Sequence, residues 1–238
     1  MATDLVVPLA PGVWRIRLLR DYINGFIFRD DDGQVTLVDM GLTSHGPKVI
    51  AALDAIGSGV GDVTRLLLTH AHPDHAGGAA QVSRATGRPV DLHEDDAEFV
   101  RSGQEPPRDG SMRIGALANR LMGGRQAFEP VEVGETFVDG QVVPVAGGLE
   151  VVHTPGHSPG HAAYLHRDSG VLITGDSIFN VRGLRWPIKA FCTNFVMTTQ
   201  TAERLTTLDY TTAAFTHGVE LRDNPRAAIG TFLARNRL

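Results

Sequence analysis

Cysteine is nearly absent from this 238-residue sequence, in which Cys192 is the only one. A single cysteine cannot form an internal disulfide, and it cannot supply the thiolates of a cysteine-rich zinc site. Any bound metal must therefore be held by nitrogen and oxygen atoms. Because the sequence names no partner base for Cys192, we interpret it as a small buried or loop residue.

Long apolar runs are also missing. No stretch of about 18 consecutive apolar residues occurs, so no transmembrane helix is predicted. The opening residues, "MATDLVVPLAPGVW", lack the basic region and long apolar core of a signal peptide. These absences predict a cytoplasmic protein without a membrane partner.

Clustered positive charge is the third absence. The formal net charge is −5 at pH 7, and no basic run or arginine-rich arm is present. Nucleic-acid-binding proteins need such a cluster to displace the counterions of the phosphates. We therefore expect a small-molecule substrate and no nucleic-acid partner, while a homodimer stays open.

The order of the predicted elements indicates a mixed α and β fold. The first 41 residues alternate short β-rich runs with turns, which predicts an antiparallel meander, and a buried strand is predicted at 63–70. No linker or repeat interrupts residues 1–238, so one domain is expected, with two sheets and helices outside them. A Gly/Pro-broken insertion at about 104–127 is predicted to cover a pocket. Helices are predicted over residues 44–57, 76–87, 94–103, 112–123, 198–208 and 224–236.

The segment "HAHPDH" at residues 70–75 concentrates side chains that bind metals. In an extended segment side chains alternate, so His70, His72 and Asp74 tend to one side while His75 points elsewhere. One short loop could therefore serve two neighbouring metals.

Further candidate ligands follow other strand-like runs. His157 comes after "LEVVH", Asp176 ends "VLITGD" and His217 ends "AAFTH". Imidazole and carboxylate ligands without thiolate suit zinc, and iron and manganese are alternatives. His153 and His161 flank His157 and are left outside this ligand set. The remaining histidines are interpreted as surface or packing residues: His45, His93 and His166.

Taken in order, five motifs resemble those of the metallo-β-lactamase superfamily: "LVDMG" at 37–41, "THAHPDHAGG" at 69–78, "HTPGHSPGH" at 153–161, "TGD" at 174–176 and "THG" at 216–218. The resemblance covers nearly the whole chain and implies an α+β fold, a four-layer αβ/βα sandwich. It implies that His70, His72 and His157 bind a first metal, that Asp74, His75 and His217 bind a second, and that Asp176 bridges them. Asp39 would lie next to these ligands and hold an imidazole in place.

The resemblance also implies a reaction. Two zinc ions would share a hydroxide that attacks a carbonyl, and Asp74 would be catalytic by orienting the hydroxide or passing on its proton. The ligand set is similar to those of glyoxalase II and the N-acyl homoserine lactonases, so we expect hydrolysis of a small ester, lactone or thioester.

Several features separate the members of the superfamily. True β-lactamases are disfavoured, because they normally have another residue at the position of Asp176. Glyoxalase II has a helical domain after its last ligand, whereas only residues 218–238 follow His217 here, which disfavours a glutathione thioester. Lactonases commonly place a tyrosine three residues after the bridging aspartate, where this chain has Phe179.

Two other kinds of protein remain as alternatives. One is an oxygenase similar to the persulfide dioxygenases, which bind a single iron through two histidines and an aspartate. The other is a binding protein that a metal stabilises without catalysis.

Two segments are expected to shape the substrate pocket. The first is the insertion, with the apolar residues Met112, Ile114, Leu117, Leu121 and Met122. The second is the loop that brings Trp186 and Phe191 beside Arg182, Arg185 and Lys189, and Phe179 and Tyr22 could also reach the pocket. Such a pocket would fit an apolar acyl group with an anionic or polar end. Alternatively, these residues simply pack on the sandwich.

Overall fold

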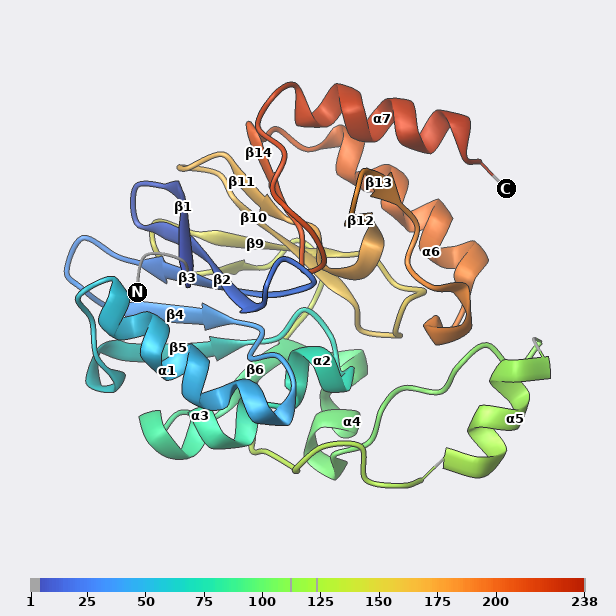
Figure 1. The fold of residues 1–238 in the computed structure, drawn as a ribbon, viewed down its shortest axis with the longest axis horizontal. Helices are drawn as coiled ribbons and strands as arrows, with labels where there is room; N and C mark the ends of the chain where they lie inside the picture. The colour runs from blue at the N-terminus through green and yellow to red at the C-terminus, as the bar shows by residue number, and fades with distance from the viewer. Residues whose placement is uncertain (1–4, 112, 123, 238) are drawn as a thin grey trace.

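Two β-sheets face each other at the centre of the molecule, and helices cover their outer surfaces (Figure 1). The computed structural model describes residues 5–111, 113–122 and 124–237, without the side chains of Ile114, Ala118 and Met122. The arrangement of helix, sheet, sheet and helix is the four-layer sandwich that the sequence predicts.

The larger sheet has its strands in chain order. Its first four strands pair antiparallel, which confirms the predicted meander, and the later strands pair parallel. Its strands are β1 (Val6–Ala10), β2 (Val13–Leu19), β3 (Ile23–Arg29), β4 (Val35–Val38), β5 (Val63–Leu67), β6 (Val90–His93) and β7 (Val133–Phe137).

The second sheet has the order β14-β11-β10-β9-β8, and β11 pairs parallel with β14. Its strands are β8 (Val142–Val143), β9 (Leu149–His153), β10 (Ala162–His166), β11 (Val171–Ile173) and β14 (Thr212–Ala214). A short hairpin, β12 (Phe179–Asn180) with β13 (Leu184–Arg185), lies in a segment for which the sequence predicts only a loop.

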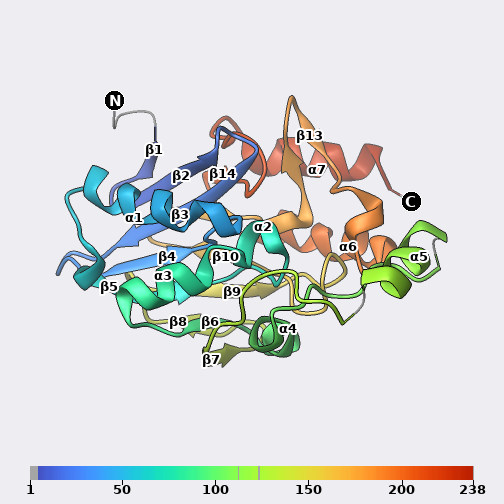
Figure 2. The same cartoon turned by 60° about the horizontal axis from the view of Figure 1, so that its bottom comes forward.

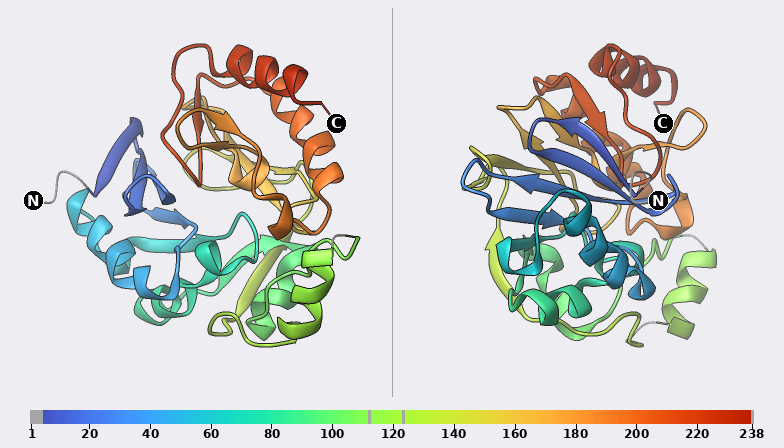
Figure 3. Two further views of the ribbon diagram at one scale, coloured as in Figure 1. Left: turned by 45° about the vertical axis from the view of Figure 1, so that its right-hand side comes forward. Right: turned by 60° about the vertical axis from the view of Figure 1, so that its left-hand side comes forward.

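The helices fall into two outer layers. On the larger sheet lie α1 (Gly46–Ala55), α2 (Pro73–Ala76), α3 (Ala79–Thr86) and α4 (Ala97–Ser102), and α6 (Phe195–Thr201) and α7 (Pro225–Arg235) cover the second sheet (Figure 3). None of the helices in the described part of the chain is both long and apolar enough to cross a bilayer.

Side-chain alternation along the strands explains why both faces of each sheet are buried. In β3, Phe26 and Phe28 belong to the core between the sheets, while Ile23 and Ile27 pack toward the helices. β10 behaves in the same way, because Tyr164 faces the other sheet and its neighbours face the outer helices. Strands covered on both sides need apolar residues at successive positions, as the sequence has them.

One predicted helix is shorter than expected. The sequence predicts a helix over residues 198–208, but α6 ends at Thr201 and 3-10 turns continue over Ala202–Thr207. The threonine hydroxyls here bond to nearby carbonyls; for example, Thr206 Oγ1 donates to Glu203 O at 2.8 Å. Such local bonds compete with a regular α-helix.

The insertion lies apart from the sandwich. Its helix α5 (Arg113–Met122) sits at one end of the molecule and is reached by extended segments (Figure 2). The side chains of Leu117 and Leu121 are 56% and 57% exposed, so they do not pack on the body as apolar residues usually do. Met112 and the side chains of Ile114 and Met122 lie outside the described residues.

Candidate metal centre

The candidate ligands meet where several strands end. Asp39 follows β4, the His70 loop follows β5, and Asp176 and His217 follow β11 and β14. Because β4 and β5 run parallel, and β11 and β14 do too, the carboxyl ends of each pair open at one edge. The structure brings all seven residues that the sequence nominates into one cluster.

Three imidazoles converge in the first group. His70 Nε2 lies 3.0 Å from His72 Nδ1, which lies 2.9 Å from His157 Nε2. Ligands on a tetrahedral zinc ion are separated by about 3.3 Å, given bonds of about 2.0 Å. A small expansion of this group would therefore accommodate a zinc ion.

Asp176 lies between this group and a second one. Its Oδ2 is 3.1 Å from His157 Nε2, whereas its Oδ1 is 3.4 Å from His75 Nε2 and 3.3 Å from His217 Nε2. Asp74 approaches the second group as well, with Oδ2 3.5 Å from His217 Nε2. One carboxylate thus presents an oxygen to each group, as a bridging ligand must.

The charges of the cluster suit a cation. Burial lowers the pKa of His70 and His72 well below the usual value, so both imidazoles are neutral, which is the form that binds a metal. Burial opposes the charged form of His157 too, but Asp176 outweighs it and raises the pKa of His157 to about 10. In the same way, Asp176, Asp74 and Asp39 outweigh burial and raise the pKa of His75 to about 9. The carboxylates thus attract positive charge to the place where metals would bind.

One buried nitrogen of the cluster has no hydrogen-bond partner within the described part of the chain, which also favours a bound cation. His75 Nε2 is inaccessible to solvent and has no hydrogen-bond partner among the described residues. A buried nitrogen without a partner costs free energy unless it binds something. The donor set of imidazoles and carboxylates fits borderline or hard divalent cations, and His75 Nε2 would gain a partner from one.

The remaining nitrogen of each of three ligand imidazoles is held by a side chain. His75 Nδ1 donates to Asp39 Oδ2 at 2.8 Å. His70 Nδ1 lies 3.0 Å from Thr69 Oγ1, which itself donates to Asp39 Oδ2 at 2.8 Å. His157 Nδ1 lies 3.4 Å from Cys192 Sγ. These contacts fix the ring orientation of the ligands, and Asp39 has the position that the resemblance implies.

In a fourth candidate ligand, His217, a backbone carbonyl holds the remaining ring nitrogen. His217 Nδ1 donates to the carbonyl of Tyr22, and Asn24 Nδ2 donates to the carbonyls of Phe215 and Gly218 on either side of His217. The segment 22–24 thus fixes the loop after β14.

Asp96 is the most important residue that sequence reasoning missed. It is fully buried, and its Oδ2 accepts from the backbone N–H of Ala71 at 2.9 Å and from Ser158 Oγ at 2.6 Å. Its Oδ1 accepts from the N–H of Gly160 at 2.6 Å. One carboxylate therefore joins the loop of His70 and His72 to the loop of His157. The sequence places Asp96 in an acidic run, where nothing distinguishes it from Asp95.

Other expectations about single residues change as well. Cys192 is buried, as interpreted, but it contacts a candidate ligand. His161 lies directly beneath the cluster, where its Nε2 accepts from the N–H of Asp176 at 2.7 Å. The left-handed Gly175, with a φ of 54°, makes this approach possible, because a Cβ there would lie 2.4 Å from His161 Nε2. His93 is a packing residue, stacked on His153 with ring centroids 3.8 Å apart.

A cavity of about 350 Å³ opens beside the cluster. Phe179 and Phe191, two of the four aromatic residues expected at the substrate pocket, line it, and the Phe179 ring lies 4.4 Å from the His217 ring. Tyr22 and Trp186 do not line it. Tyr22 contributes its carbonyl and leaves a side chain that is 46% exposed.

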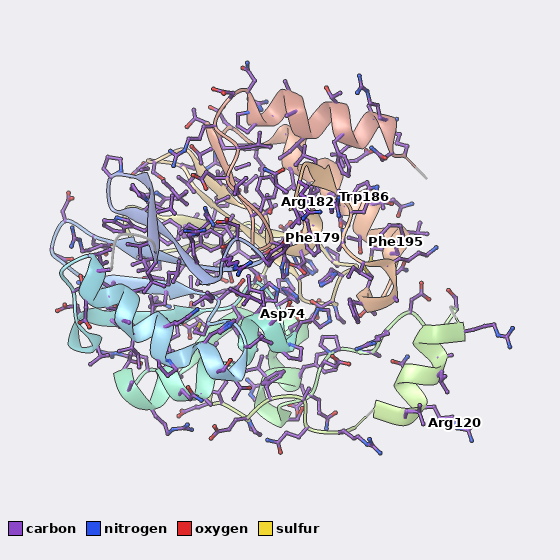
Figure 4. The ribbon with its side chains drawn as sticks, viewed as in Figure 1. Asp74, Arg120, Phe179, Arg182, Trp186 and Phe195 are labelled. Atoms are coloured by element: carbon purple, nitrogen blue, oxygen red, sulfur yellow. The ribbon has the colours of Figure 1, made fainter. Side chains whose placement is uncertain are left out.

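Trp186 packs in the outer core because its ring meets Phe195 and Phe232. Figure 4 shows Asp74 near the centre of the molecule below Phe179, with Trp186 farther out toward the helices of the second sheet. The sequence alone does not distinguish an aromatic loop residue that packs in a core from one that lines a pocket.

Comparisons with known proteins agree with this arrangement. The profile of the Metallo-beta-lactamase superfamily matches residues 19–217. The chain is 28% identical over 208 residues to the probable metallo-hydrolase YybB of Bacillus subtilis, covering 87% of this chain and 85% of the relative. It is 26% identical over 154 residues to the hydroxyacylglutathione hydrolase GloC of Haemophilus influenzae, covering 63% of this chain and 64% of the relative.

Solved structures share the fold. A metallo-beta-lactamase family protein from Thermus thermophilus superposes with a TM-score of 0.73 at 26% identity, covering 96% of this chain and 80% of that one. The Rm3 metallo-beta-lactamase also reaches 0.73, at 19% identity, covering 98% and 93%. The chain therefore belongs to the metallo-beta-lactamase superfamily and has the residues of a metal-dependent hydrolase.

Proposed function

We propose that the protein is a dinuclear zinc hydrolase that cleaves a small ester, lactone or thioester. The observation that carries this proposal is the position of Asp176, whose two oxygens face two separate groups of imidazoles. The first metal would be held by His70, His72 and His157, and the second by Asp74, His75 and His217. Iron or manganese could take the place of zinc with the same ligands.

When bound, the metals would lower the pKa of a water and polarise the substrate carbonyl. The chain's own residues would prepare this chemistry. Asp39, Thr69, Cys192 and the Tyr22 carbonyl orient the ligand rings, and Asp176 balances the charge of both groups. Asp74 has a side chain that is 34% exposed and lines the cavity, so it is placed to take up a proton there.

The cavity supports a small substrate. Its volume of about 350 Å³ is at the lower end for small-molecule sites, and much of its lining is apolar. The relatives named as hydroxyacylglutathione hydrolases support a thioester among the candidates. Phe179 brings no hydroxyl to the cavity, so the lactonase-like alternative would have to work without the tyrosine of that group.

The second group of candidate ligands, Asp74, His75 and His217, disfavours the mononuclear iron alternative. A single iron held by two histidines and an aspartate would leave His217 and Asp74 without a function, although both face Asp176 or His75 within 3.7 Å. A purely binding role would not need Asp74 at the cavity wall.

The test is metal analysis combined with a substrate panel. We expect two equivalents of zinc, iron or manganese per chain, and hydrolysis of at least one ester, lactone or hydroxyacylglutathione thioester. A chelator should abolish this activity and lower the melting temperature, and added zinc should restore both. One iron per chain, with no hydrolysis and with oxygen uptake on glutathione persulfide, would establish the oxygenase instead.

A further inference from the structure

Arg108 and Glu105 bring charge into a cavity wall that is otherwise largely apolar. Both residues line the cavity beside the metal cluster, together with Leu42, Pro73, Phe179, Ile188 and Phe191. Apart from the candidate ligands, they are the charged residues of this wall in the described part of the chain. Polar groups placed in an apolar pocket usually orient a ligand.

The Arg108 guanidinium is held in place from two sides. Its Nη2 donates to Glu105 Oε1 at 3.1 Å, and its Cζ lies 4.7 Å above the centre of the Phe191 ring. The side chain of Arg108 is only 17% exposed. A stacked and paired guanidinium keeps its planar fork in one orientation, which lowers the entropy cost of binding a ligand.

The backbone around Arg108 is fixed as well. The N–H and the carbonyl of Arg108 both bond to the side-chain amide of Asn119, at 2.9 and 2.7 Å. Thr193 Oγ1 donates to the Pro107 carbonyl, and the N–H of Asp109 donates to the Cys192 carbonyl. The segment 105–109 is thus joined to the loop that carries Phe191 and contacts His157.

Two nitrogens of the Arg108 guanidinium are available to bind a ligand. Its Nε and Nη1 have no hydrogen-bond partner within the residues that the structure describes. Glu105 therefore occupies only a minor part of the guanidinium fork, and the other N–H donors stay available to a ligand in the cavity. A planar carboxylate is the group that fits the remaining donors.

The cations expected from the sequence do not take this role. Arg182 and Arg185 are exposed on the β12–β13 hairpin, and neither lines the cavity. Lys189 is turned toward Phe195, with Nζ 5.4 Å from the ring centre.

We propose that Arg108 selects substrates that carry a carboxylate on the part of the molecule farther from the reacting carbonyl. This inference rests on the proposed function, because it names the substrate class of the same site. The substrate would be an ester, lactone or thioester of a dicarboxylic or similarly anionic acid. Its reacting carbonyl would lie at the metal cluster, its apolar chain on Phe179 and Phe191, and its carboxylate on Arg108.

The experiment compares two esters of matched length on the metal-loaded protein. These are the phenyl monoester of glutaric acid, which ends in a carboxylate, and phenyl pentanoate, which ends in a methyl group. Arg108→Met should lower kcat/KM for the glutarate ester by about 10- to 100-fold, the loss typical of a charge-assisted hydrogen bond. The same variant should leave phenyl pentanoate within about twofold. Arg108→Lys, which keeps the charge and loses the fork, should fall between the two proteins.

One further variant serves as a control, and another tests the opposite change. Arg185→Met removes the same charge from an exposed position outside the cavity and should change neither ester. Glu105→Gln removes the carboxylate that competes for Arg108 and should raise the preference for the glutarate ester. An equal loss on both esters in Arg108→Met, or an equal loss in Arg185→Met, would overturn the inference.

A binding measurement separates this inference from the proposed function. Calorimetry on the metal-loaded protein should show that glutarate binds more tightly than pentanoate, and that Arg108→Met removes the difference. If the wild-type protein cleaves neither ester, nor anything else in the panel, the proposed function fails, and this measurement still decides the role of Arg108. Equal affinities for both acids would show that the metals alone bind them and would refute the selection.

Discussion

Two parts of the chain beside the cavity are built differently: the candidate metal cluster, which forms its floor, and the insertion at about 104–127, whose Glu105 and Arg108 belong to its rim. At the floor, the five imidazoles are buried, and side chains or a backbone carbonyl hold the outer nitrogens of four of them. In the insertion, Glu105 and Arg108 line the cavity and are held by a hydrogen bond and by stacking on Phe191. Leu117 and Leu121 of α5 are not among the lining residues and are more than half exposed. The difference indicates that dense packing holds the candidate metal ligands, while the insertion packs densely only where it meets the cavity.

The largest effect should come from a floor residue that faces the cavity. Asp74→Asn keeps the shape of the side chain but cannot accept a proton, so kcat/KM should fall by about 10²- to 10⁴-fold. The melting temperature should stay close to that of the wild type, because Asp74 is partly exposed. Steady-state kinetics and thermal unfolding check both parts, and an unchanged kcat/KM would remove Asp74 from the catalytic machinery.

A slightly smaller effect is expected at Asp96, which joins the two loops that carry His72 and His157. Asp96→Asn replaces a carboxylate oxygen by an amide N–H that faces another donor, so the free energy of unfolding should fall by about 2 to 4 kcal/mol. Metal affinity, measured by competition with a chelator, should fall too, because the loops of His72 and His157 would separate.

The neighbouring residue provides the control for this variant. Asp95 has a side chain that is 51% exposed, so Asp95→Asn should change the free energy of unfolding by less than about 0.5 kcal/mol. Similar losses in both variants would show that Asp96 has no special role in joining the loops.

A third effect concerns pH. Burial, with the nearby His153, lowers the pKa of His93 to about 4. Its usual value, 6.5, applies in the unfolded chain, which therefore binds the proton first as the pH falls. The stability contributed by neutral His93 is fully present above pH 6.5 and is lost as the pH falls toward about 4, by about 2 kcal/mol.

This pH effect can be isolated by a variant that cannot titrate. His93→Phe keeps a ring against His153, so its free energy of unfolding should depend less on pH between 6.5 and 4 than that of the wild type. Chemical unfolding at several pH values measures the difference. Parallel curves for the two proteins would contradict the assigned shift.

The smallest effect is expected in the exposed helix α5 of the insertion. Leu117→Ser and Leu121→Ser should each change the free energy of unfolding by less than about 0.5 kcal/mol, because both side chains are already more than half exposed. Kinetics on the pentanoate ester should also stay within about twofold of the wild type. A marked rise in KM would show that α5 contacts the substrate.

The fold could be predicted to a large extent because its signals are local. Strands buried on both faces show as continuous apolar runs, and the meander shows as runs separated by turns. Helices α3 and α4 end directly before the glycines Gly87 and Gly103. The hairpin at 179–185 and the short α6 are not predicted. Their pairing and their threonine hydrogen bonds depend on neighbours that no window of sequence contains.

The candidate ligand set follows from the sequence alone, because imidazoles and carboxylates at the ends of strands are chemically distinctive wherever they occur. What holds those ligands, and what faces the substrate, depends on the tertiary structure. The Tyr22 carbonyl, Asp96 and Cys192 act through contacts with residues distant along the chain, at 195, 25 and 35 positions respectively. Trp186 turns to the core and Arg108 to the cavity for a related reason: the direction of a loop side chain is set by the packing around it, which local sequence does not encode.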